Sequence, residues 1–193
     1  MKTYTPDELQ QVRKLHAEWL LDHMKGSRAN LSKANLSKAD LSGADLSGAD
    51  LSRADLYGVN LREANLCGAK IEKATLPAFI ICPEEGRFIG WKKARCSTHG
   101  YAVLKLRIEE NSKRICSLIG RKCRASRVTV VDAFTVDGKP VDPGLVFTSD
   151  KDPSFTYQVG KTVFVEANED IRVECSHGIH FFMTRKEAVE YSF

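Results

Sequence analysis

The sequence predicts a mainly β protein in three parts: a capping helix over residues 1–28, a short column of repeats over 29–76, and a β-rich α+β domain over 77–193. Three observations lead to this prediction. A five-residue unit repeats ten times without interruption, a helix-start pattern precedes it, and short β-branched or aromatic runs separated by turn residues follow it. A repeat with a fixed period dominates the choice of fold class, because the chain must place every unit in an equivalent environment.

The N-terminal segment is predicted to form one amphipathic helix. Thr5 and Glu8 have the spacing of a capping box, and Pro6 suits the first helical position. Apolar residues and two histidines then fall mostly at steps of three and four, on one face: Leu9, Val12, His16, Trp19, Leu20 and His23. Gly26 can end the helix in the left-handed conformation. We expect His16 to be packed and hydrogen-bonded rather than catalytic.

The repeat predicts a square column. Its centre is leucine in nine units and Ile71 in the other, and two residues earlier stands alanine in nine units and Val59 in the other. A period of five fits neither an α-helix nor a strand, because the leucines would point in changing directions. They share one interior only if the backbone turns a corner in each unit. Four corners close a square, so Leu31 would stack on Leu51, and Leu51 on Ile71.

This pattern resembles the pentapeptide-repeat family, and the resemblance implies a right-handed quadrilateral β-helix of about two and a half coils. The preceding helix with the segment GSRANL resembles the leader of many such proteins. It implies that the helix covers the first coil, hiding a sheet edge that would otherwise pair with other strands.

The remaining residues predict a compact β-rich domain. Its expected strands cover residues 79–82, 88–91, 101–108, 127–135, 155–159, 162–165 and 178–183. Thr184 and Glu187 form a second capping box before a last short helix. We expect the first strands to cover the open end of the column. The segments FIGWKKAR, GRKCRAS, FTYQVGKTV and ECSHGIHFFMTRKEAVEY resemble a C-terminal domain that accompanies pentapeptide repeats in phage and bacterial proteins and has no assigned activity.

The net charge of +4 hides a strong asymmetry. Residues 87–127 contain twelve basic and two acidic residues, whereas residues 128–193 contain six basic and eleven acidic ones. Around Gly120 gather the basic residues Lys113, Arg114, Arg121, Lys122, Arg124 and Arg127. Glycine beside guanidinium groups is a plausible cradle for the phosphate of a nucleotide or nucleic acid. The favoured alternative is pairing with acidic residues such as Glu166, Glu169 and Asp170. Few aromatic residues lie nearby for base stacking.

The cysteines and histidines offer two further hypotheses. Cys175 and His180 have the residue types of a nucleophile and its base, although no third residue can be named to orient them. Cys175, His177 and His180, with Cys96 and His99, also include the groups that zinc prefers. The six cysteines form no C-x-x-C pair and their spacing is irregular, so we expect no metal and no cofactor. The same irregular cysteine spacing favours a reduced, cytosolic setting.

Three functions remain in competition. The leading one is a non-enzymatic interaction or inhibitor protein that presents a rigid surface to a protein partner, with a host-takeover or anti-defence role if the chain is phage-encoded. The second is a nucleotide- or nucleic-acid-binding module that uses residues 113–127. The third is an enzyme centred on Cys175 and His180. No apolar run approaches the roughly 20 residues of a membrane span, so we expect a cytoplasmic protein, in the host cytoplasm if a phage encodes it.

Overall fold

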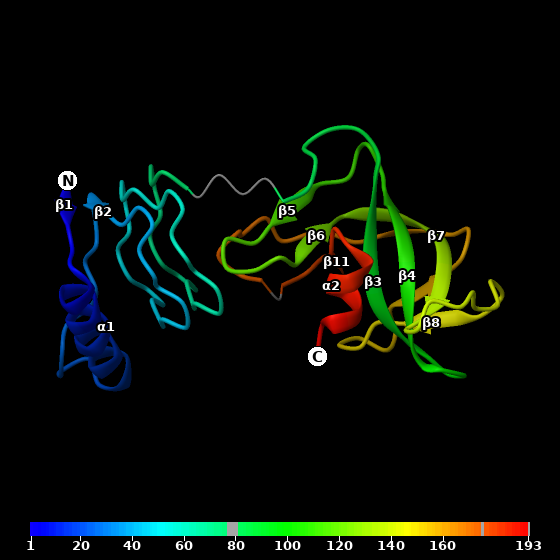
Figure 1. The fold of residues 1–193 in the computed structure, drawn as a ribbon, viewed down its shortest axis with the longest axis horizontal. Helices are drawn as coiled ribbons and strands as arrows, with labels where there is room; N and C mark the ends of the chain where they lie inside the picture. The colour runs from blue at the N-terminus through cyan, green and yellow to red at the C-terminus, as the bar shows by residue number, and fades with distance from the viewer. Residues whose placement is uncertain (77–80, 175, 193) are drawn as a thin grey trace. The chain divides into compact units, whose positions relative to one another are not determined.

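The computed structural model describes residues 1–76, 81–174 and 176–192 (Figure 1). The chain divides into two compact units. Unit 1 contains residues 1–79 together with two short segments, 117–120 and 170–174. Unit 2 contains residues 80–116, 121–169 and 175–193. The chain therefore leaves unit 2 twice to contribute short loops to unit 1.

Unit 1 begins with a short strand and a helix. Strand β1 (Lys2–Thr3) pairs in parallel with β2 (Ala34–Asn35) in the repeat. Helix α1 (Pro6–Leu21) starts with the predicted capping box, in which Thr5 and Glu8 bind each other's backbone N–H groups. The prediction that Gly26 ends the helix is wrong: the helix ends at Leu21, and the left-handed Gly26 belongs to the loop that follows.

His16 joins this helix to the repeat, as the sequence predicts. The side chain is fully buried, and its Nδ1 accepts a hydrogen bond of 3.1 Å from the backbone N–H of Ala29. The ring stacks on Trp19 with a centroid distance of 5.5 Å. Burial, the largest effect on this group, lowers the pKa of His16 below its ordinary value. His16 is thus a structural residue at the start of the repeat.

The repeat places residues 20 apart side by side. Six isolated parallel bridges, such as Asn30 with Asp50 and Asp55 with Thr75, all have this offset, which equals four units. The central leucines and the alanines two residues earlier form one buried core, with Leu51 completely buried. The Asp or Asn of a unit caps the turn locally; for example, Asn30 Oδ1 accepts from the backbone N–H of Ser32 over 3.1 Å. The predicted inward and outward positions are confirmed from Leu31 to Leu66, whereas the last two centres differ: Ile71 is only partly buried and Leu76 is exposed.

The C-terminal end of the repeat core is covered by segments from later in the chain. Leu118 and Ile119 pack against the core, and the guanidinium group of Arg172 donates to the backbone oxygen of Ala69. The prediction that the first strands of the C-terminal domain would cover this end is wrong for the described residues. Leu118 and Ile119 lie in a loop and not in a strand. Their side chains pack on the core although their backbone adds no strand to the repeat.

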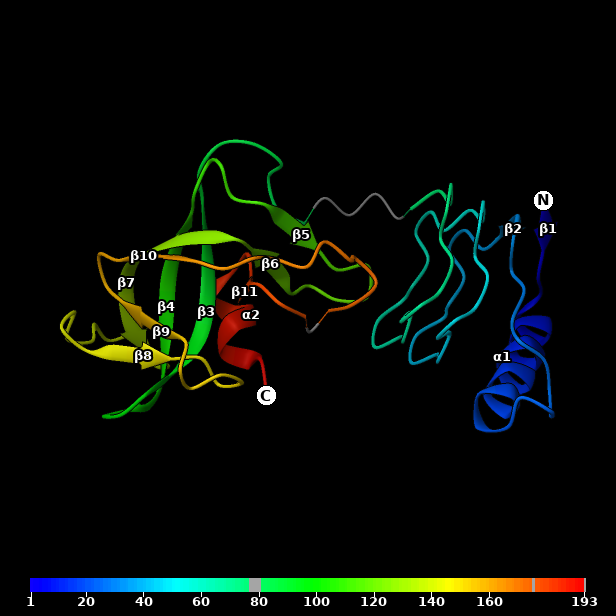
Figure 2. The same ribbon diagram turned by 180° about the vertical axis from the view of Figure 1, so that it is seen from behind.

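Unit 2 contains two sheets and a helix (Figures 1 and 2). The larger sheet has the order β10-β7-β4-β3-β8-β9, and its strands are β3 (Phe88–Cys96), β4 (Gly100–Ile108), β7 (Arg127–Thr135), β8 (Val146–Thr148), β9 (Thr156–Gln158) and β10 (Thr162–Phe164). The smaller sheet has the order β11-β6-β5, with β5 (Arg114–Cys116), β6 (Cys123–Ala125) and β11 (Ile179–Phe181). Helix α2 (Arg185–Glu190) follows, and its predicted Thr184–Glu187 capping box is confirmed.

The predicted strands agree with this arrangement in part. The prediction for residues 127–135 coincides with β7, and that for 101–108 nearly coincides with β4. Strand β3 extends five residues beyond the predicted end at Trp91. The three-residue strands β5, β6 and β8 were not predicted at all, because such short strands carry almost no periodic signal. The expected strand at 79–82 falls partly outside the described residues, and residues 81–82 are not in a strand.

The core of unit 2 lies between its two sheets. Leu104, Leu106 and Val130 from the larger sheet pack in one buried cluster with Ile179 and Phe181 from the smaller one. Within the part of the chain that the structure describes, no helix is both long and apolar enough to cross a membrane.

Candidate functional site

A pocket of about 620 Å³ opens in unit 2. Strand β3 contributes Lys92 and Lys93, the residue before β6 contributes Lys122, and β11 contributes His180. The other lining residues come from the turn after β8, from β9 and its approach, and from the end of the chain: Ser149, Asp150, Lys151, Asp152, Phe155, Tyr157, Val165, Ser176, His177, Gly178, Phe182 and Tyr191. Its volume lies in the range of small-molecule sites. The pocket combines basic groups with aromatic rings.

Two of its lysines are buried. Only 8% of Lys92 and 4% of Lys122 is exposed, which is rare for lysine because an ammonium group loses its hydration on burial. The pKa of Lys92 is lowered to about 8, mainly by burial and also by the positive charge of Lys122, while Asp150 opposes both effects. Among the described residues, no hydrogen bond or ion pair links the Lys92 ammonium group to a carboxylate. The pocket therefore places positive charge where an anion can bind.

Aromatic rings lie beside both ammonium groups. Lys122 Nζ donates a hydrogen bond of 2.8 Å to the phenolic oxygen of Tyr191 and lies 4.5 Å from the centre of its ring. Lys92 Nζ lies 5.4 Å from the centre of the Tyr157 ring. Both ring distances fall within the range of cation–π contacts. Burial raises the pKa of Tyr157, so its phenol stays neutral at physiological pH. The rings compensate the buried charges in part without neutralising them.

Two other charged groups of the pocket, Lys93 and Asp150, have defined structural partners. Lys93 Nζ donates to the backbone oxygens of Val189 and Tyr191, over 3.2 and 3.0 Å, and so binds the last carbonyls of α2. Asp150 accepts from Arg95 Nε over 2.6 Å, and only 8% of its side chain is exposed. The acid that acts electrostatically on Lys92 is thus already bound by an arginine.

The six basic residues singled out in the sequence lie in different surroundings. Lys122 lines the pocket, whereas Arg124 on β6 is only 1% exposed. Lys113 pairs with Glu169, and Arg121 Nε pairs with Glu187 at 2.6 Å. The remaining two bind carbonyls or a ring: Arg114 donates to the backbone oxygens of Pro83, Gly86, Glu109 and Glu110, and the Arg127 guanidinium carbon lies 5.5 Å from the centre of the Phe164 ring.

The expected cradle around Gly120 faces a carboxylate. A side chain added at Gly120 would collide with Oε1 of Glu174. Glu169, named as an alternative partner for the basic stretch, does bind one of its lysines, Lys113. Among the six basic residues of the stretch, Lys122 is the one that lines the pocket.

The cysteine and histidine candidates also lie in different places. His180 lines the pocket, while Cys175 lies outside the described residues. Cys96 Sγ lies 3.7 Å from His99 Nδ1. Of the described histidines and cysteines proposed as zinc ligands, none belongs to a group of three or more whose ligand atoms converge.

Sequence reasoning missed Lys92, and a signal was present. In β3 the buried positions alternate as Gly90, Lys92, Ala94 and Cys96, so a lysine occupies the inward face of a strand of small residues. Because the strand was predicted to end at Trp91, this alternation was cut off. The sequence prediction also missed a cluster of three cysteines elsewhere in unit 2. The sulfur atoms of Cys82, Cys116 and Cys123 all lie within 4.8 Å of one another.

Comparison with known proteins agrees with this two-part organisation. Residues 27–62 and 44–77 match pentapeptide repeats, and residues 78–188 match a family of unknown function, DUF5758. Uncharacterized protein L223 of Acanthamoeba polyphaga mimivirus is 30% identical over 90 residues, which is 47% of this chain and 55% of the relative, so the chain spans about half the relative's length. This relative is viral, but it gives no support to the expected phage or bacterial type. Since the second match covers more than half of the sequence, the chain belongs to the DUF5758 family and carries pentapeptide repeats before the DUF5758 domain.

Proposed function

We propose that this chain is a non-enzymatic binding protein whose unit 2 captures a small anionic ligand in the pocket around Lys92 and Lys122. The observation that carries the proposal is the burial of two ammonium groups at one pocket, with 8% and 4% of the side chains exposed. Burying an ammonium group costs free energy even where polar groups surround it, and a bound anion would supply opposite charge to both lysines.

The ligand class follows from the rest of the lining. A phosphate or carboxylate can bind both ammonium groups, and the rings of Phe155, Tyr157 and Tyr191 can receive a flat apolar part. A mononucleotide combines these features and fits a pocket of this volume. This form of the second sequence hypothesis differs from the original one, since the ligand is bound by Lys122 with Lys92 and not by the whole stretch 113–127.

The repeat has a separate part in the proposal. The bridges between residues 20 apart support a right-handed quadrilateral β-helix, the fold that the family resemblance implies. Such a rigid column suits the leading sequence hypothesis of a protein partner. A host-takeover or anti-defence role has the viral origin of one relative as its support.

Calorimetric titration of the full chain tests the pocket. AMP, ADP, ATP and inorganic phosphate are titrated into the wild type and into the variant Lys92→Met/Lys122→Met. Methionine is one atom shorter than lysine, keeps most of its unbranched apolar chain and removes the charge, so the variant should fold and lose at least about 90% of the affinity, which corresponds to about 1.4 kcal/mol. The matched control is Lys161→Met, because Lys161 is exposed and does not line the pocket.

Two results would contradict the proposal. One is that no phosphate compound binds the wild type; the other is that the double variant binds as tightly as the wild type. Binding of a DNA or RNA oligonucleotide that weakens steeply with salt and survives the double variant would favour the nucleic-acid hypothesis for residues 113–127 instead.

A further inference from the structure

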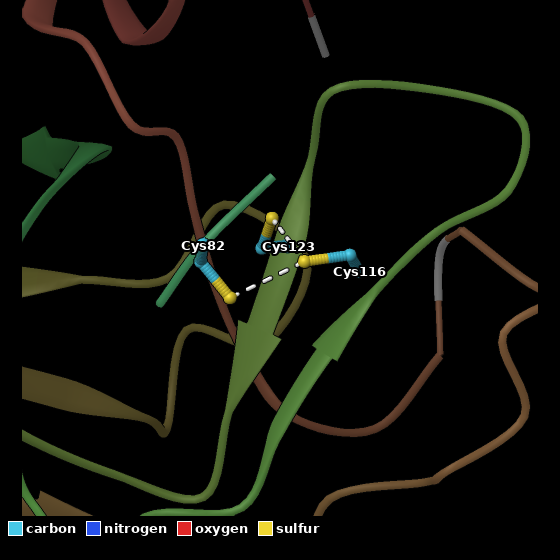
Figure 3. A group of neighbouring side chains, drawn as sticks. All are labelled: Cys82, Cys116 and Cys123. Carbon is cyan, nitrogen blue, oxygen red and sulfur yellow. Dashed lines mark hydrogen bonds between the residues drawn. The ribbon is translucent and has the colours of Figure 1, made fainter. Parts of the chain in front are cut away.

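Three cysteines converge in unit 2, away from the basic pocket. Cys116 Sγ lies 3.2 Å from Cys82 Sγ and 3.4 Å from Cys123 Sγ (Figure 3). Figure 3 shows the sulfur of Cys116 between the other two, with the three side chains pointing toward one another. Cys82 and Cys123 are buried, and Cys116 is half-buried. None of the three lines the pocket.

The fold explains why they meet. Cys116 on β5 and Cys123 on β6 are direct cross-strand partners in an antiparallel pair, so their side chains lie on the same face. Cys82 arrives from the segment before β3. Arg114 holds that segment in place, since its guanidinium nitrogens donate to the backbone oxygens of Pro83 and Gly86, over 3.2 and 2.5 Å. The convergence therefore depends on tertiary contacts across 34 residues.

We propose that Cys82, Cys116 and Cys123 bind one Zn²⁺ ion as a three-thiolate site. Thiolate is a preferred ligand of zinc, with a Zn–S distance of about 2.3 Å, which puts the sulfur atoms of a tetrahedral site about 3.8 Å apart. The sulfur atoms need to move by only about half an ångström to reach this spacing, a shift that a small change in side-chain torsion supplies. The fourth ligand, water, approaches from the side of the half-buried Cys116, because the described residues place no fourth His, Cys, Asp or Glu atom in the group.

Charge favours a divalent ion over monovalent copper. Three thiolates carry three negative charges, and Zn²⁺ leaves one uncompensated. The positive charge of Arg114 acts electrostatically on Cys82, so it offsets that remaining charge. The Nε of Arg114 is buried and has no hydrogen-bond partner among the described residues. A buried N–H without a partner is costly, and the negative field of a metal–thiolate group would stabilise it.

The expected consequence is that zinc ties the segment before β3 to the smaller sheet. Metal binding occurs in the folded state only, so its free energy adds to stability. This proposal departs from the expectation of no metal, which rested on the irregular spacing of the cysteines in the sequence. The spacing is irregular because the three ligands come from separate elements, brought together by strand pairing and not by a local knuckle.

The test uses the full chain, purified under reducing conditions, stripped with a chelator and titrated with Zn²⁺ alone. We expect one zinc per chain by elemental analysis, a higher melting temperature, and a thiolate-to-metal absorption band when Co²⁺ replaces zinc. Cys116→Ala should reduce the zinc content to below about a tenth of one equivalent, because two thiolates hold zinc weakly. Cys67→Ala is the matched control, since Cys67 is exposed on the repeat and should leave the content unchanged.

A second variant keeps the test decisive if loss of a ligand impairs folding. Arg114→Gln preserves all three thiols, and removal of an outer partner is expected to weaken zinc affinity by about 10- to 100-fold. Full zinc binding by Cys116→Ala, or less than about 0.1 equivalent in the fully reduced wild type, would overturn the proposal. So would a disulfide between two of the three cysteines that persists in reductant, since it would leave only one thiolate for the metal.

Discussion

Lys122 Nζ donates a hydrogen bond to the phenolic oxygen of Tyr191 over 2.8 Å, although the two residues stand 69 positions apart in the chain. The contact fixes a buried ammonium group at the basic pocket and links the segment before β6 to the end of α2. It gives one of the two buried pocket lysines a hydrogen-bond partner, whereas among the described residues the ammonium group of Lys92 lies beside the ring of Tyr157.

We expect this hydrogen bond to be measurable in a double-mutant cycle. Tyr191→Phe removes the acceptor, and a hydrogen bond to a charged group contributes about 1.5–3 kcal/mol to the free energy of unfolding. In the Lys122→Met background the same change should cost clearly less, because the ammonium group that donates to the phenolic oxygen is absent. Urea denaturation of the four proteins provides the comparison. Equal effects of Tyr191→Phe in both backgrounds would show that the contact has no energetic weight.

The affinity of the pocket for an anion should fall at alkaline pH. Burial lowers the pKa of Lys92 to about 8, so this lysine is protonated at neutral pH and loses its charge as the pH rises through 8. An anion binds the charged form, hence ADP affinity should decrease as the pH rises from about 7 to about 9. Calorimetry over this range is the measurement. In Lys92→Met the decrease should be absent, and a wild type with the same affinity at both ends would contradict the assignment.

The repeat core should carry most of the stability of unit 1. Leu51 is completely buried, so Leu51→Ala should cost about 2–5 kcal/mol by leaving a cavity that the stacked coils cannot close. Tyr57, in the next unit along the chain, is 55% exposed, and Tyr57→Ala should change the unfolding free energy by no more than about 0.5 kcal/mol. Thermal unfolding followed by circular dichroism compares the two. Similar losses in both variants would mean that the packing of the repeat is not what stabilises it.

Two left-handed glycines of unit 1 should respond differently to substitution. Gly43 has a φ of 62° and open space where a Cβ would stand. Gly43→Ala should therefore lower the free energy of unfolding only by the strain of a left-handed alanine, about 1 kcal/mol. Lysine already occupies the equivalent place at Lys38, with a φ of 61°. Gly26 has a φ of 60°, but a Cβ there would collide with the backbone oxygen of Leu15. Gly26→Ala should therefore destabilise unit 1 clearly more in urea denaturation, and a smaller loss than that of Gly43→Ala would refute the steric argument.

The larger sheet could be anticipated most clearly where its strands are long, although the predicted runs 155–159 and 162–165 also contain the three-residue strands β9 and β10. The β-branched run of β7 and the apolar run of β4 were visible, because nine-residue strands repeat their inward positions several times. Strands β5 and β6 have three residues each and give no such repetition. Their absence from the prediction hid the pairing of Cys116 with Cys123, and with it the cysteine cluster.

By itself the sequence determined the repeat core and both helix starts, since these depend on contacts with a fixed short period. Leu51 is buried because every unit turns the chain by the same amount, and Thr5 caps α1 through a residue only three positions away. Tertiary structure alone decided that Lys92 meets Lys122, that Cys82 meets Cys116, and that Leu118 and Ile119 pack on the repeat core. These contacts join segments whose pairing is set by the registers of whole sheets and by which buried surfaces fit together, and no local pattern of residues encodes that choice.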